Sequence, residues 1–243
     1  MLKLIAALTM LIDHIGMVLF PQYSIFRIIG RIAMPLFAFS VSQGFYYTHQ
    51  RARSFKYLRD LLVFSLLSQG PYQYMLYVVG ISRFTLNIGF TWTFSLMILL
   101  AVDDLSGHNL RQQIRGVLLF LIGVAIPGFV AVDYGFFGIV LPLIIYLLFF
   151  NNRWLLVTGA NGNKSLVKPG LISYVIFLLF FAVMNLLFYA TGGSVLQNYS
   201  LLVILFIPLN FMPTLAVKIP KKFFYIFYPL HILLLTIIRL IYW

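Results

Sequence analysis

The sequence contains no cysteine and no glutamate, and only 9% of its 243 residues are charged. Without cysteine the chain has no disulfides, no thiolate metal ligands and no cysteine nucleophile. Soluble domains contain about 25% charged residues. A soluble chain of this length could not bury a composition that is 62% hydrophobic. We therefore expect an integral membrane protein whose first partner is the lipid bilayer.

Acidic side chains are scarce as well. The five acids are Asp13, Asp60, Asp103, Asp104 and Asp133. Two histidines and one aspartate within apolar segments are a thin ligand set, so we predict no metal site. The net charge of +12 is typical of nucleic-acid binding in a soluble protein. Here the basic residues lie in short loops between apolar runs, which indicates membrane orientation and no nucleic-acid partner.

Apolar runs long enough to cross a bilayer, roughly 20 residues each, follow one another along the chain. We predict an all-α, polytopic membrane bundle, a single domain over 1–243 with about nine transmembrane helices and a range of 8–10. The predicted spans are 2–20, 28–47, 58–78, 86–103, 114–132, 134–150, 170–190, 199–216 and 223–242. Gly70-Pro71 should break the third span and leave 72–84 re-entrant or interfacial. The short link 132–134 predicts a tight antiparallel pair of the fifth and sixth spans.

Basic residues cluster in alternate loops. They are Arg51, Arg53, Lys56 and Arg59 after the second span, Arg111 and Arg115 after the fourth, Arg153, Lys164 and Lys168 after the sixth, and Lys218, Lys221 and Lys222 after the eighth. The positive-inside rule makes these loops cytoplasmic. We therefore predict a multi-pass protein of the bacterial plasma membrane with a cytoplasmic amino terminus. Arg27 and Arg83 fall on the opposite side, which favours a local role for each.

The first span carries two adjacent ionisable residues, Asp13 and His14. A carboxylate near the middle of a spanning helix costs about 2.5–3.5 kcal/mol on insertion scales, so such a group indicates a functional site. Arg27 and Arg31 are one helical turn apart on the second span, and Arg31 can meet Asp13 at similar depth. The alternatives are a pair that only locks two helices, a locally paired Asp13, and a His14 hydrogen-bonded in the core.

The ninth span offers partners for this group. Tyr228 and His231 are three residues apart and can face one neighbour, although a Tyr–His pair also occurs in ordinary cores. Pro229, between them, frees a backbone carbonyl, which membrane helices often tolerate beside a cavity. The polar candidates for the pocket are Arg27, Ser68, Gln69 and Asn87. Uncharged polar residues of this kind also hold membrane helices together.

Seven stretches along the chain form a recognisable pattern. The more specific ones are Met10–Gly16, Arg27–Phe39 and Tyr225–His231, and the others are Gly44–Thr48, Lys56–Arg59, Ser68–Pro71 and Asp133–Gly138. Together they resemble the TraX family, membrane proteins of conjugal transfer that are linked to N-acetylation of pilin. The resemblance extends over nearly the whole chain. The family in turn is similar to transmembrane acyltransferases, which place a histidine late in the first span and use acyl-CoA.

The resemblance implies an acetyltransferase in the membrane that moves an acetyl group from acetyl-CoA to an amine or hydroxyl. The acceptor is then a protein, peptide or glycan, with the pilin amino terminus as the family's example. His14 is expected to act as general base or to become transiently acetylated, with Asp13 to orient it. Arg31 is expected to stabilise the oxyanion, and Tyr228 and His231 to line the pocket or protonate the thiolate. The residues expected to bind the acetyl-CoA phosphates are Arg51, Arg53, Lys56, Arg59, Arg111 and Arg115.

Two other functions are compatible with this sequence. A secondary transporter fits an intramembrane cluster of aspartate, arginine and histidine, but internal repeats and paired broken helices are not evident. A noncatalytic pilus or envelope assembly factor explains the hydrophobicity but not the buried polar residues. The basic residues are also explained singly as orientation signals.

Overall fold

The computed structural model describes residues 2–49, 52–150, 170–190, 194–211 and 220–242. Throughout these ranges the regular structure is helical, and one isolated bridge joins Leu86 to Val132. The helices are α1 (Leu2–Val18), α2 (Ser24–Gly30), α3 (Ala33–His49), α4 (Ser54–Val78), α5 (Ile88–Leu105), α6 (Leu110–Phe129), α7 (Gly135–Phe149), α8 (Leu171–Ala190), the 3₁₀ segments η1 (Val195–Leu205) and η2 (Ile207–Phe211), and α9 (Lys221–Tyr242). This confirms the all-α prediction.

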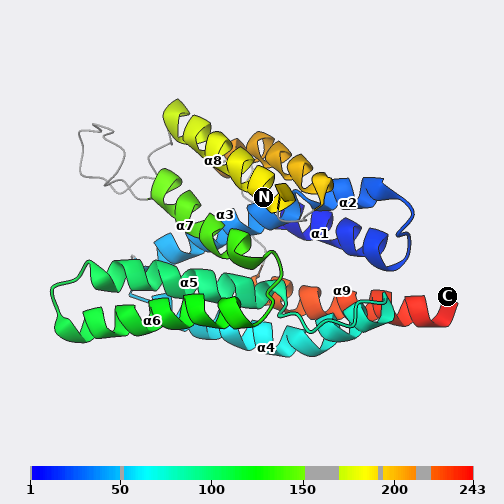
Figure 1. The fold of residues 1–243 in the computed structure, drawn as a ribbon, viewed down its shortest axis with the longest axis horizontal. Coiled ribbons are helices and arrows are strands. Elements are labelled where there is room, and N and C mark those ends of the chain that lie inside the picture. Colours follow the sequence, from blue (N-terminus) through cyan, green and yellow to red (C-terminus); the bar gives the residue numbers. More distant parts are fainter. Residues whose placement is uncertain (1, 50–51, 151–169, 191–193, 212–219, 243) are drawn as a thin grey trace.

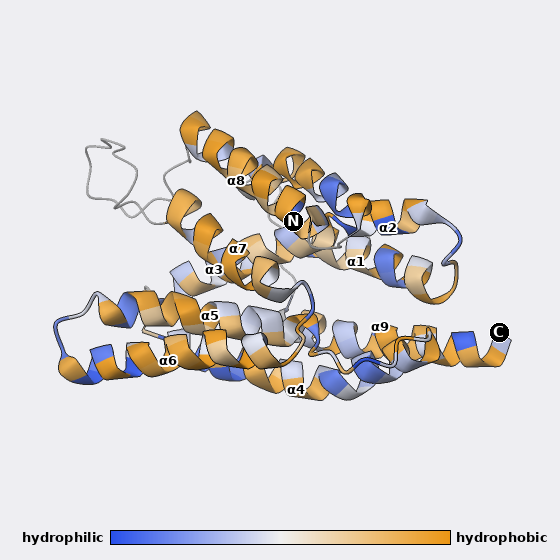
Figure 2. Cartoon of the chain, in the orientation of Figure 1, coloured by the Kyte–Doolittle hydropathy of each residue, from blue (hydrophilic) through white to orange (hydrophobic). Residues whose placement is uncertain are grey.

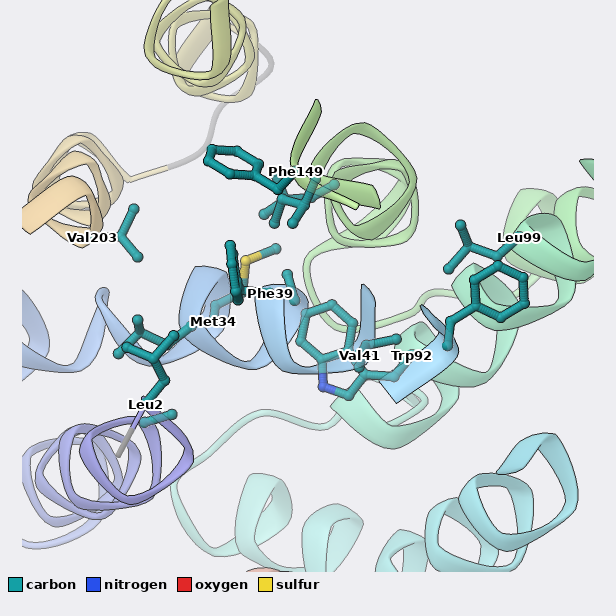
Figure 3. Packing of buried hydrophobic residues seen from close by; sticks show 14 of the residues in the cluster. Leu2, Met34, Phe39, Val41, Trp92, Leu99, Phe149 and Val203 are labelled. Atoms are coloured by element: carbon teal, nitrogen blue, oxygen red, sulfur yellow. The ribbon is translucent and has the colours of Figure 1, made fainter. Parts of the chain in front are cut away.

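Helix α3 lies at the centre of the molecule (Figure 1). It packs against α1, α4, α5, α7 and η1, and its side chains Leu36, Ala38 and Phe39 are completely buried. Figure 3 shows Phe39 between α7 and η1. The Ser42 hydroxyl also donates to the carbonyl of Pro142 in α7 at 2.7 Å. Apolar packing and one interhelical hydrogen bond therefore hold α3 in the centre of the helical bundle.

Five described helices are long and apolar enough to cross a membrane: Ser24–His49 (α2 and α3 taken together), Ile88–Leu105, Leu110–Phe129, Leu171–Ala190 and Phe223–Tyr242. Many apolar residues of α6, α8 and α9 are exposed, and these helices are coloured mainly as hydrophobic in Figure 2, as expected for contact with lipid. The 17 residues of α1 and 15 of α7 measure only about 26 and 23 Å, less than a hydrocarbon core of about 30 Å. The structure indicates a membrane protein without confirming nine spans.

The third predicted span differs from our expectation at Gly70-Pro71. Helix α4 continues through Pro71 to Val78, so no re-entrant piece begins at Tyr72. The polar side chain of Gln69 binds the Thr85 carbonyl at 2.9 Å and the Asn87 backbone N–H at 3.0 Å. These bonds tie this part of α4 to the following loop. A proline removes one helical hydrogen bond, and neighbouring contacts of this kind compensate for the loss.

The predicted antiparallel pair of the fifth and sixth spans is wrong. Helix α6 packs along α5, whereas α7 turns away and packs against α3 and α5. The reason lies in the link between them. The Leu86 N–H donates to Ala131 at 2.8 Å and the Asp133 N–H donates to Leu86 at 2.9 Å. Pairing with the α4–α5 loop therefore redirects the chain before α7 begins.

Helices α1 and α2 cross closely where glycines remove side-chain bulk. A Cβ atom on Gly16 would overlap Phe26, and a Cβ atom on Gly30 would overlap the Asp13 side chain. Helix α2 ends at Gly30, and a turn at Arg31 and Ile32 precedes α3. This close crossing brings the second segment against the polar residues of α1.

Candidate active site

The centre of the candidate site is a pair of histidines from opposite ends of the sequence. His14 of α1 and His231 of α9 are both buried. The Nδ1 atom of His14 lies 2.7 Å from Nε2 of His231, and the two rings stack with centroids 5.0 Å apart. Tyr228 packs against both imidazoles, with ring centroids 6.1 Å from His14 and 5.8 Å from His231. The prediction that Tyr228 and His231 face one neighbour is confirmed, and that neighbour is His14.

The hydrogen bonds assign the proton positions of this pair. Nδ1 of His231 lies 2.6 Å from the Phe227 carbonyl oxygen, and a carbonyl oxygen can only accept. In two neutral imidazoles, Nδ1 of His231 therefore carries the proton and its Nε2 is an acceptor. Nδ1 of His14 must then donate, which leaves the lone pair on Nε2 of His14. His231 therefore orients His14 as a base. We had predicted that Asp13 would orient it.

We had predicted that Asp13 pairs with Arg31, but in the structure it pairs with Arg27. Nη1 of Arg27 donates to Oδ2 of Asp13 at 2.7 Å, and both side chains are largely buried. The turn at Arg31 and Ile32 changes the helical phase after Gly30, so the two arginines do not occupy one continuous face. Oδ1 of Asp13 and Nε of Arg31 are buried and have no hydrogen-bond partner. Such atoms are uncommon in folded interiors and are typical of sites where polar ligands or water bind.

A cavity of about 1370 Å³ contains these groups. Its wall follows α4 from Arg53, before the first residue of the helix, to Arg83, beyond its last. The polar lining residues near the histidine pair are Asp13, His14, Arg27, Arg31, Asp133, Tyr134 and Tyr228. His231 is not on the wall and holds His14 from behind. A small number of polar groups in a long, mainly apolar cavity is the usual form of a binding site for an organic substrate.

Sequence reasoning did not identify Asp133 as a site residue. It lies in the α6–α7 link and lines the cavity. Burial and the nearby Asp13 carboxylate raise the pKa of Asp133 to about 6, while Arg31 and Arg27 oppose the shift. One available signal was its rarity, since it is one of five acids in the chain. Another was its position between two apolar segments, where a charge is costly.

The basic residues that were expected to bind acetyl-CoA fall into two groups. Arg53 and Lys56 line the cavity at the start of α4, and Lys3 of α1 lines the same cavity. Three others lie elsewhere: Arg59 pairs with Asp60 at 2.9 Å, Arg111 is exposed in the first turn of α6, and Arg115 pairs with Asp104 at 2.6 Å. Arg51 lies outside the described residues.

The uncharged candidates for the pocket lie between α4 and α5. Asn87 caps α5, and its amide donates to the Ser65 carbonyl at 2.8 Å and to Oε1 of Gln69 at 2.9 Å. Ser68 is buried with no partner for its hydroxyl. None of these three side chains lines the cavity, and the bonds of Gln69 and Asn87 join two helices. No group of three metal-ligating side chains occurs among the residues that the structure describes.

Comparison with known proteins gives one family and two relatives. The family model described as TraX protein matches residues 1–239. An uncharacterized protein of Rickettsia prowazekii is 54% identical over 46 residues, which are 19% of this chain and 18% of the relative. A probable fimbrial assembly protein FimC, serogroup H1, of Dichelobacter nodosus is 26% identical over 152 residues, or 59% of each chain. The chain thus spans less than two thirds of either relative. No solved structure matches.

Proposed function

Because this chain belongs to the TraX protein family, we propose that it is a membrane-embedded acetyltransferase. In this proposal it transfers an acetyl group from acetyl-CoA to an amine or hydroxyl of an acceptor. The observation that carries the proposal is the His14–His231 pair, in which His14 lines the long cavity and His231 binds it from behind. The pair provides a buried base whose orientation is fixed by a hydrogen bond, and a positioned base is the main requirement of general-base catalysis.

The first part of the proposed mechanism concerns His14. The acceptor nitrogen or oxygen attacks the thioester carbonyl carbon, and Nε2 of His14 takes the proton that the acceptor loses. The resulting imidazolium donates through Nδ1 to His231, which donates in turn to the Phe227 carbonyl. This chain spreads the new positive charge over two rings and a backbone dipole. His231 thereby orients and stabilises the base, as a carboxylate does in other acyl-transfer enzymes.

The second part concerns the charge that develops on the substrate. Attack places negative charge on the thioester oxygen, and Arg31 is the lining cation assigned to stabilise it. Its buried Nε atom has no partner, so part of its hydrogen-bonding capacity is unused. When the carbon–sulfur bond breaks, the thiolate takes the proton from His14. Acetylated acceptor and free thiol are formed, and the histidine pair returns to its first state.

The third part concerns how the donor enters. Acetyl-CoA carries several negative charges on its nucleotide, and the residues that line the cavity include Lys3 of α1 and Arg53 and Lys56 at the start of α4. We assign the nucleotide to these cations, with the acyl arm extending along α4 toward His14. By the positive-inside rule this end is cytoplasmic, where acetyl-CoA is available. The protein is then placed in the bacterial plasma membrane with its amino terminus inside.

The acceptor is assigned from the relatives. Membership of the TraX family and similarity to a probable fimbrial assembly protein both support a pilus-related membrane protein. We propose a pilus subunit or another envelope polypeptide or glycan as the acceptor. The same similarity favours, as a second candidate, an assembly factor without enzymatic activity.

Labelled acetyl transfer distinguishes these functions. Membranes that contain wild-type protein are supplied with acetyl-labelled acetyl-CoA, and the label in polypeptides, glycans and the vesicle interior is measured. An acetyltransferase labels an acceptor, and His14→Ala abolishes the labelling. The matched control is His108→Ala, because His108 is exposed in the α5–α6 loop. No labelling by wild-type membranes that assemble pili normally would contradict catalysis, and substrate flux without acetyl-CoA would indicate a transporter.

A further inference from the structure

The short α6–α7 link is held by hydrogen bonds to the α4–α5 loop and to α5. The bridge between Leu86 and Val132 pairs it with the α4–α5 loop. The buried Thr91 hydroxyl of α5 donates to the Asp133 carbonyl at 2.7 Å. Every one of these bonds uses the backbone of the link. The carboxyl group of Asp133 takes part in none of these bonds; it accepts from the backbone N–H of the adjacent Tyr134, and it lies at the cavity wall.

The backbone after Asp133 has an uncommon conformation. Tyr134 has φ 59° and Gly135 has φ 52°. Glycine adopts positive φ readily, but a tyrosine in the left-handed region is unfavourable by about 1–2 kcal/mol. Such a residue persists when surrounding contacts determine it, and it is frequent at functional sites. Here Tyr134 ends the link and Gly135 is the first residue of α7, so the chain turns through two left-handed residues immediately after Asp133.

Asp133 interacts electrostatically with charged residues that line the same cavity. Its carboxyl group is repelled by Asp13 and attracted by Arg31 and Arg27. Asp13 is already paired with Arg27, whereas Asp133 forms no ion pair within 4 Å among the described residues. It is thus a carboxylate at the cavity wall whose charge remains available to a substrate.

We propose that Asp133 is a specificity-determining residue that positions an amine acceptor next to His14; this rests on the proposed acetyl transfer. A neutral primary amine has a lone pair and two N–H groups. The lone pair attacks the thioester carbon, one proton passes to His14, and the second N–H donates to Asp133. The thiolate then leaves with the proton from His14, and the product amide keeps the N–H that Asp133 holds.

A hydroxyl acceptor lacks the second hydrogen. Its single proton passes to His14, and the ester oxygen then presents only lone pairs to Asp133. A carboxylate facing lone pairs is repelled and left without a partner, which is how buried polar groups reject an analogue. Asp133 therefore selects amines over hydroxyls, and this selection should disappear when the carboxylate is removed.

The test compares a peptide that has a free amino terminus with the same peptide carrying an α-hydroxyl in place of the amine. Purified wild type, Asp133→Leu and Asp103→Leu are measured for binding of each peptide, for the KM of each, and for acetyl-CoA cleavage without acceptor. Leucine is close to aspartate in size and removes both acceptor oxygens, whereas asparagine would still accept the amine N–H through Oδ1. Asp103 is a suitable control because it is half-exposed and its side chain contacts His49 at 3.5 Å, away from the cavity wall.

We expect Asp133→Leu to weaken amine binding and raise its KM by about ten- to a hundredfold. Binding of the hydroxyl peptide, and cleavage without acceptor, should remain unchanged. Equal losses for both peptides, or unchanged amine binding, would overturn the assignment of Asp133. Absence of cleavage in wild type would instead remove the proposed acetyl transfer, and the binding measurements would still decide the role of Asp133.

Discussion

His14 obtains its orientation from a second imidazole, and this affects which substitutions at position 231 are tolerated. The ring of His231 stacks on Phe227 at 4.7 Å and on His14 at 5.0 Å. A phenylalanine would keep this stacking but remove the acceptor of the His14 proton. Packing and proton relay can therefore be separated by one substitution.

His231→Phe should lower catalytic turnover by about ten- to a hundredfold and destabilise the protein by about 1–3 kcal/mol, because the Nδ1–H of His14 loses its partner. Thr236→Val is the control on the same helix, since the buried Thr236 hydroxyl bonds only to its own helix at Ile232. Turnover and thermal unfolding in detergent are the measurements. Unchanged turnover in His231→Phe would show that His14 needs no acceptor at Nδ1.

The residue scale also shows what the sequence predicts well. Two histidines in apolar segments must each find a hydrogen-bond partner, so the approach of His14 and His231 was predictable from their surroundings. The choice of Arg27 over Arg31 was not, because it depends on a turn at Ile32 that an apolar run does not reveal. Asp133 was missed for a similar reason, since backbone pairing with Leu86 determines its place.

At the scale of elements, the site depends on how closely α1 and α2 approach. Gly30 allows α2 to lie directly against Asp13, and the same crossing brings Arg27 within 2.7 Å of that carboxylate. Length and composition predicted most of the helices, although a turn separates α2 from α3 near the start of the second predicted span, and the described part of the eighth is 3₁₀. They did not predict that α7 packs away from α6. A short link favours antiparallel packing of the two helices that it joins, but here the link pairs with the α4–α5 loop and changes the direction of the chain.

Gly30→Ala should separate α1 from α2 and destabilise the protein by about 1–3 kcal/mol, because overpacking forces backbone shifts. Gly70→Ala is its control: no atom lies within 4 Å of the added Cβ in α4, so it should be neutral or stabilising by up to about 1 kcal/mol. Thermal unfolding of both variants is measured in the same detergent. Equal stability of the two would contradict the close crossing.

At the scale of the whole molecule, the cavity extends along α4 and is lined by residues at both ends of this helix. Arg53 precedes this helix and Arg83 follows it, and both line the wall. The proposed direction of donor entry depends on which end faces the cytoplasm. The alternation of basic loops predicts that the α3–α4 and α5–α6 loops are cytoplasmic and that the α4–α5 loop is external.

Single cysteines test this orientation directly, because the chain has none of its own. Ser82 in the α4–α5 loop and Ser106 after α5 are both exposed. In intact cells a membrane-impermeant maleimide should label Ser82→Cys at once, and Ser106→Cys only after the membrane is opened. The reverse pattern would place the Arg53 end of the cavity outside and would contradict cytoplasmic entry of the donor.

The most direct measurement of the central claim is thiol release from acetyl-CoA by purified protein in the presence of an amine acceptor. Wild type should release thiol in proportion to acetylated acceptor. His14→Ala should be slower by a factor of about 10² to 10⁴, the usual contribution of a general base, while remaining folded. Thiol release that is equal in wild type and His14→Ala, or absent from both folded proteins, would contradict acetyl transfer at the His14–His231 pair.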